Sequence, residues 1–89
     1  MIVQNPKKQT IEEIKKEFKG YCVLIVDRDV NERGTTLAGR VIVYDKWMKD
    51  VWEQMETISQ EDYPGLWDSW DLTESEGYVY SGVSEVIHV

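Results

Sequence analysis

The chain has 89 residues, of which 42% are hydrophobic, and its formal net charge at pH 7 is −7. This length fits one domain spanning residues 1–89, and the hydrophobic fraction is that of a globular chain, not an intrinsically disordered one. The longest apolar run, Tyr21–Val26, is far shorter than the roughly 20 residues that a membrane helix needs. We therefore expect no membrane insertion. The negative charge repels nucleic-acid phosphates, so we also expect no direct nucleic-acid binding.

The first predicted element is a helix that begins after Thr10 and ends near Lys19. Thr10 and Glu13 have the spacing of a capping box, in which each side chain bonds the backbone N–H of the other residue. Gly20 suits the left-handed conformation that commonly follows a helix. The predicted apolar face consists of Ile11, Ile14 and Phe18.

Two strands are predicted next, covering Tyr21–Val26 and about Thr36–Tyr44. The first strand is apolar at every position, which is typical of an interior strand covered on both faces. The polar segment Asp27–Gly34 between them has turn chemistry, and so short a connection favours an antiparallel hairpin. Gly39 indicates a bulge or a close contact within the second strand.

A second helix is predicted from Lys46 to about Ile58, with Asp45 as its N-cap. The segment Leu66–Glu74 has helix-like and strand-like spacings and fits either structure, whereas Tyr78–Tyr80 and Val83–Val89 are strand-like. This order of elements predicts an α+β fold: a small antiparallel or mixed sheet of roughly three to five strands with two helices packed on it. The predicted apolar stripe of the second helix consists of Met48, Val51, Trp52, Met55 and Ile58.

The charges are distributed unevenly along the chain. All ten Lys and Arg residues lie within residues 1–49, whereas residues 50–89 hold ten acids and no base. An acidic half suits a basic partner surface, although charge of this size also serves plain solubility. The N-terminal lysines could equally contact the acidic half of a second copy, which would produce a homo-oligomer.

No catalytic or metal-binding constellation can be drawn from the sequence. The chain has one cysteine, Cys22, and one histidine, His88, which are too few for a zinc site or for a nucleophile with its base. We therefore expect a non-catalytic chain with no metal and no cofactor. Cys22 is expected to be a small core residue, and a single cysteine without a secretory signal predicts a reducing, cytoplasmic setting.

Acidic and aromatic residues are interspersed between residues 61 and 80. Aromatic anchors surrounded by carboxylates are typical of binding sites for basic partners. The alternative is that Trp67 and Trp70 fill the core while the acids are solvated. The predicted partner-binding residues are Tyr63, Trp67, Asp68, Trp70, Asp71, Glu74 and Glu76.

Three functional hypotheses follow from these features. The first is a protein-interaction or regulatory module that binds a basic protein through the acidic, aromatic second half. The second is an acidic inhibitor or immunity-type protein that blocks a basic nucleic-acid-acting enzyme. The third is a small ligand-binding domain or enzyme that uses a cluster of Asp68, Asp71 and Glu74.

Overall fold

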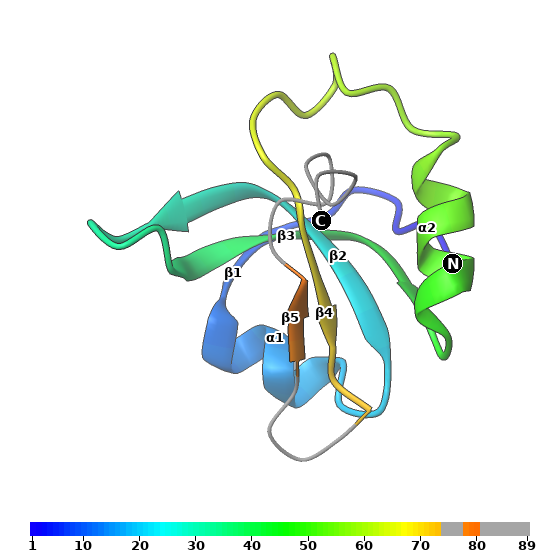
Figure 1. Cartoon of the computed structure of the whole chain (residues 1–89), viewed down its shortest axis with the longest axis horizontal. Helices are drawn as coiled ribbons and strands as arrows, with labels where there is room; N and C mark the ends of the chain where they lie inside the picture. The colour runs from blue at the N-terminus through cyan, green and yellow to red at the C-terminus, as the bar shows by residue number, and fades with distance from the viewer. Residues whose placement is uncertain (74–77, 81–89) are drawn as a thin grey trace.

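A computed structural model describes residues 1–73 and 78–80 of the chain (Figure 1). Within these residues, five strands form one antiparallel sheet in the order β1-β3-β2-β4-β5, and two helices pack on it. This arrangement confirms the predicted α+β class. The elements are β1 (Lys8–Thr10), α1 (Ile11–Glu17), β2 (Cys22–Val30), β3 (Thr36–Asp45), α2 (Met48–Met55), β4 (Asp68–Asp71) and β5 (Tyr78–Tyr80).

Strand β2 lies in the middle of the sheet and is covered on both faces. Val23 and Ile25 point toward α1, where they pack with Ile14. Leu24 and Val26 point the other way and share a second cluster with residues of α2. The two helices accordingly lie on different sides of the sheet (Figure 1), which confirms the prediction of an interior strand.

The capping box at the start of α1 is present. The Glu13 N–H donates to Thr10 Oγ1 at 3.2 Å, and the Thr10 N–H donates to Glu13 Oε1 at 2.9 Å. The helix ends at Glu17, two residues earlier than predicted. Gly20 has a φ of 90°, a left-handed conformation that turns the chain into β2.

The N-terminal residues form an edge of the sheet that the sequence did not predict. Lys8–Thr10 pairs with β3 as β1, and Ile2 forms an isolated bridge with Val43. The Val3 N–H donates to the Ile42 carbonyl at 2.9 Å. Three-residue strands carry too few positions for a period-two pattern, so β1 had no signal in the sequence.

The hairpin of β2 and β3 is antiparallel, as predicted, but its turn lies further along the chain. Strand β2 continues to Val30, and the turn is closed by the Asn31 side chain, whose Oδ1 accepts from the backbone N–H groups of Arg33 and Thr35. The predicted turn Asp27–Gly34 therefore began too early, since residues 27–30 belong to β2. Polar residues can occupy the end of a strand that projects beyond the core.

A bulge allows β2 to continue past its apolar stretch. Asp27 has a φ of 51°, and the register of β2 against β3 shifts between Val26 and Asp29. Gly39 lies opposite this bulge, where an added Cβ would overlap Ile25 Cγ2 and lie 3.0 Å from the Val26 carbonyl oxygen. The close contact predicted at Gly39 is confirmed.

The prediction of Asp45 as the N-cap of the second helix is wrong. Helix α2 begins at Met48, and Trp47 occupies the cap position without a side-chain bond. Asp45 is the last residue of β3, and its carboxylate instead accepts from the Lys46 N–H and from Gln54 Nε2. The helix ends at Met55, but the predicted apolar stripe faces the sheet around the buried Val51.

The segment that the sequence left undecided between helix and strand contains strand β4. It pairs with β2 from Asp68 opposite Ile25 to Asp71 opposite Cys22. The predicted strand Tyr78–Tyr80 is β5, whereas the predicted strand Val83–Val89 lies outside the described residues. Within the described part of the chain, neither helix has the length and apolarity needed to cross a membrane.

Candidate functional site

The two tryptophans of the predicted binding segment are core residues. Trp67 is 3% exposed and packs on the α2 side, and its Nε1 donates to the Tyr63 carbonyl at 2.7 Å. Trp70 is 6% exposed and packs on the α1 side, with Lys15 Nζ 5.3 Å from its ring centroid. A small domain fills its interior with such large side chains, so the core alternative describes both rings.

Asp68 is the charged centre of a buried network that joins three strands. Its side chain is 1% exposed, and its Oδ2 lies 2.9 Å from an amino nitrogen of Arg28 on β2. The hydroxyl of Thr36 on β3 donates to the same oxygen. The Arg28 Nε donates to the Leu66 carbonyl at 3.0 Å. In this arrangement Asp68 stabilises the sheet and offers no carboxylate to a partner.

Asp71 faces the opposite side of the sheet from Asp68, because the two are three residues apart in one strand. Hydrogen bonds from the hydroxyl and N–H of Thr73 hold the pKa of Asp71 below its usual value. The proposed cluster of Asp68, Asp71 and Glu74 therefore has its two described members on opposite faces. Glu74 and Glu76 lie outside the described residues. In residues 1–73 and 78–80, no group of three acidic, Cys or His side chains could hold a metal.

Cys22 is a buried core thiol, as predicted. Burial raises its pKa to about 11, and the neighbouring negative charge of Asp71 adds to the effect. The thiol therefore stays protonated near neutral pH, which makes it a poor nucleophile and a poor metal ligand.

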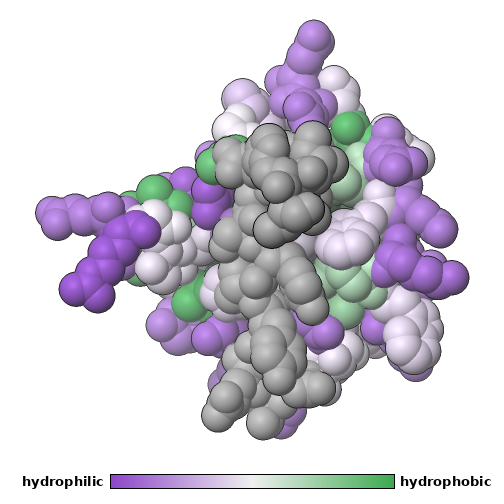
Figure 2. Space-filling view, viewed as in Figure 1, coloured by the Kyte–Doolittle hydropathy of each residue, from purple (hydrophilic) through white to green (hydrophobic). Residues whose placement is uncertain are grey.

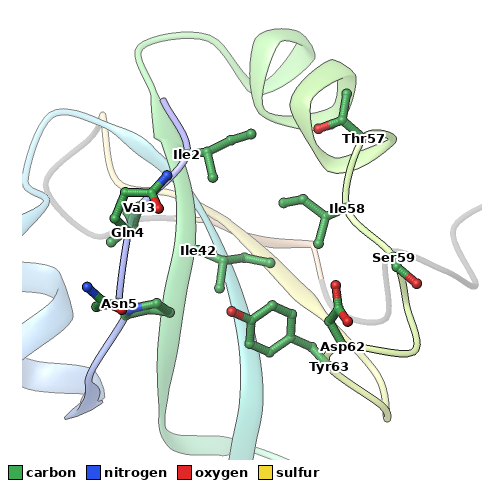
Figure 3. Close-up of a pocket in the computed structure, with 11 residues that line it drawn as sticks. Ile2, Val3, Gln4, Asn5, Ile42, Thr57, Ile58, Ser59, Asp62 and Tyr63 are labelled. Atoms are coloured by element: carbon green, nitrogen blue, oxygen red, sulfur yellow. The ribbon is translucent and has the colours of Figure 1, made fainter.

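A cleft of about 350 Å³ lies beside α2 and combines three segments of the chain (Figure 3). They are residues 2–6, Ile42 of β3, and residues 57–59 with 62–63 of the loop between α2 and β4. Strand pairing of Val3 with Ile42 fixes one wall. The bond from Trp67 Nε1 to the Tyr63 carbonyl fixes the other wall, so this buried tryptophan positions the site without lining it.

The cleft has an apolar centre and a polar rim. Ile2, Ile42 and Ile58 point toward one another, and the ring of Tyr63 closes one side (Figure 3). The Asp62 side chain lies beside Tyr63 at the rim, and no described residue donates a hydrogen bond or forms an ion pair with its carboxylate. The site therefore offers an aliphatic surface next to one unpaired negative charge.

Sequence reasoning identified one lining residue of this cleft, Tyr63, and missed the rest. Ile2 and Ile42 enter through the pairing of the N-terminal segment with β3, which left no pattern in the sequence. Ile58 was assigned only to the helix stripe. Trp47 is 67% exposed at the start of α2.

Comparison with known proteins assigns no family or relative. No protein-family model, curated protein or solved structure matches this chain significantly. Function is therefore inferred from the cleft and from the charges around it.

Replacing Asp68 by Asn is expected to destabilise the fold by about 3–5 kcal/mol, because it leaves the largely buried Arg28 without its counter-charge. Urea denaturation followed by circular dichroism measures this change. The matched control is Asp62→Asn at the exposed rim, which should change the free energy of unfolding by no more than about 0.5 kcal/mol. Equal effects of the two substitutions would show that the Arg28 pair carries no stability.

Between about pH 9 and pH 11 the wild-type protein should lose stability faster than Cys22→Ala. The unfolded thiol releases its proton near its ordinary pKa of 9.0, whereas the folded thiol retains it to about 11. The unfolded state thus binds fewer protons in this window, and the free energy of unfolding falls as pH rises. Denaturation curves of both proteins across the window measure the difference, and parallel pH profiles would contradict the buried, protonated thiol.

Proposed function

We propose that this chain is a non-catalytic binding module that accepts a lysine or arginine side chain of a basic partner protein in the cleft beside α2. Lys and Arg combine an aliphatic stem with a cationic end. The three isoleucines of the cleft match the stem, and the Asp62 carboxylate at the rim, which no described residue pairs with, matches the cation. This pairing of surfaces is the observation that carries the proposal.

The size of the cleft favours one inserted side chain over a large cofactor. Its volume of about 350 Å³ is near the lower end for small-molecule sites. Its titratable lining groups are the Asp62 carboxylate and the Tyr63 phenol. Among the described residues, neither group is paired with a second residue as nucleophile and base. This supports a site that binds its partner without catalysing a reaction.

The surroundings of the cleft favour a basic partner. Glu53, Glu56 and Glu61 are exposed on α2 and on the loop that follows it, and the sequence has no Lys or Arg after Lys49. Hydrophilic side chains cover most of the margin of Figure 2 on the side where Figure 1 places α2. The exposed acids attract a basic partner over distance and raise its association rate.

The proposed site keeps only part of the predicted binding segment, and residues 2–6 and Ile42 add to it from the first half of the chain. Tyr63 stays in the site, and Asp62 takes the charged position for which Asp68 was predicted. Trp67 supports the site from the core, whereas Trp70 packs on the α1 side, away from the α2 cluster.

Binding can be tested by NMR titration with a glycine-flanked lysine peptide and the same peptide carrying norleucine, which keeps the stem and lacks the ammonium group. We expect the lysine peptide to shift the amide signals of Ile42, Ile58 and Tyr63. The substitution Asp62→Asn should weaken its binding about 5- to 10-fold, through loss of a charge-assisted hydrogen bond.

The matched control is Glu61→Gln, which removes the same charge from the neighbouring residue outside the lining. It should change the affinity by less than about 2-fold, since exposed charges contribute little. Equal binding of the lysine and norleucine peptides, or equal effects of the two substitutions, would contradict insertion of a cation beside Asp62.

A second proposal, that the chain inhibits a basic nucleic-acid-acting enzyme, is supported by the same exposed acids. It predicts an association rate that falls steeply as salt rises. Stopped-flow mixing with a panel of basic nucleases and polymerases measures this rate for the wild type and for the triple variant Glu53→Gln, Glu56→Gln, Glu61→Gln. The triple variant should associate about 10-fold more slowly at low salt, and a rate insensitive to both salt and substitution would reject the proposal.

A further inference from the structure

A second hollow lies on the α1 side of the molecule and has a different chemistry. Its volume is about 450 Å³, and its lining consists of Val3, Glu17, Phe18, Tyr21 and Tyr44. Three of these five side chains are aromatic. They come from the end of α1, from the residue before β2 and from β3, so only the folded chain brings them together.

The Tyr44 ring contacts the other two rings at steep angles. The Tyr44 ring is 5.4 Å from Tyr21 with an interplanar angle of 89°, and 5.3 Å from Phe18 with an angle of 52°. Rings at such angles present faces in different directions instead of stacking on one another. Tyr21 and Tyr44 are half-buried, so each is held by the core while part of its surface reaches the hollow.

We propose that this aromatic hollow binds a methylated ammonium group, such as that of choline or of a methylated lysine. The negative face of an aromatic ring attracts a cation, and several rings around one cation form a recognised type of ammonium site. Glu17 contributes a carboxylate to the lining, and the Gln9 amide donates to its Oε1 at 3.0 Å, which restrains the charge near the rings.

The lining selects a methylated cation over a primary one. Quaternary nitrogen has no N–H groups to leave unpaired, whereas a primary ammonium entering this hollow would exchange several water contacts for aromatic carbon. Lys15, Lys16 and Lys19 are exposed on and after α1, so long-range charge gives little attraction here. Binding must then come from contact with the ring faces and with the Glu17 carboxylate. This inference does not depend on the lysine or arginine site beside Asp62.

The test compares choline with 3,3-dimethylbutan-1-ol, which has the same shape but a carbon in place of the charged nitrogen. NMR titration of the full chain should show choline shifting the signals of Tyr21 and Tyr44, with an affinity at least about 5-fold higher than that of the neutral analogue. Equal affinities, shifts confined to other residues, or no binding of choline would overturn the proposal.

Two substitutions at one position separate the ring from the rest of the side chain. Tyr21→Phe keeps the aromatic face and should bind choline within about 2-fold of the wild type, whereas Tyr21→Leu should bind about 5-fold more weakly. Circular dichroism and thermal unfolding establish that both variants fold. Unchanged choline affinity in folded Tyr21→Leu would overturn the proposal. If that variant fails to fold, the exposed substitution Glu17→Gln decides, with weaker choline binding expected and an unchanged affinity counting against the proposal.

A third titration identifies the source of the ammonium group. A glycine-flanked trimethyllysine peptide is titrated beside its unmethylated counterpart and beside choline. Tighter binding of the trimethyllysine peptide than of choline supports a methylated lysine of another protein, and the reverse order supports a free small cation. Equal binding of the methylated and unmethylated peptides would overturn the selectivity for methylation.

Discussion

The stretch Cys22–Val26 in β2 is buried on both faces of the sheet, and the two helices lie where they do because each covers one of those faces. Full burial of one aliphatic side chain contributes about 1.5–3 kcal/mol, so a run of consecutive buried residues outweighs any single surface interaction. The same constraint places β3 and β4 on either side of β2, because a central strand must also pair its backbone groups.

Acidic residues in one segment have opposite roles because their surroundings differ. Asp68 is buried and pairs with Arg28, which lies in the extension of β2. The bulge at Asp27 comes just before Arg28 in the chain. A buried charge persists only beside a counter-charge and hydrogen-bond donors, which Arg28 and Thr36 supply. Asp62 lies in the loop between α2 and β4, where no described residue pairs with it. The proposed cation site therefore uses Asp62, which is exposed.

The two proposals give the two hollows different means of recognising a cation. The cleft beside α2 combines aliphatic walls with one carboxylate, which suits a cation that retains its hydrogen-bond donors. The hollow beside α1 combines ring faces with a restrained carboxylate, which suits a cation without donors. The N-terminal segment contributes to both, since Val3 belongs to both linings. Its pairing with β3 therefore positions part of both linings and also extends the sheet.

The sequence by itself determined the capping box at Thr10, the buried central strand and the apolar stripe of α2, because each depends on neighbours within a few residues. The α+β class followed from the order of these elements. Only the tertiary structure decided that β4 is a strand, that Asp68 is buried and that residues 2–6 complete the cleft beside Tyr63. These features depend on contacts between residues far apart in the chain, and local periodicity carries no information about which distant segments meet.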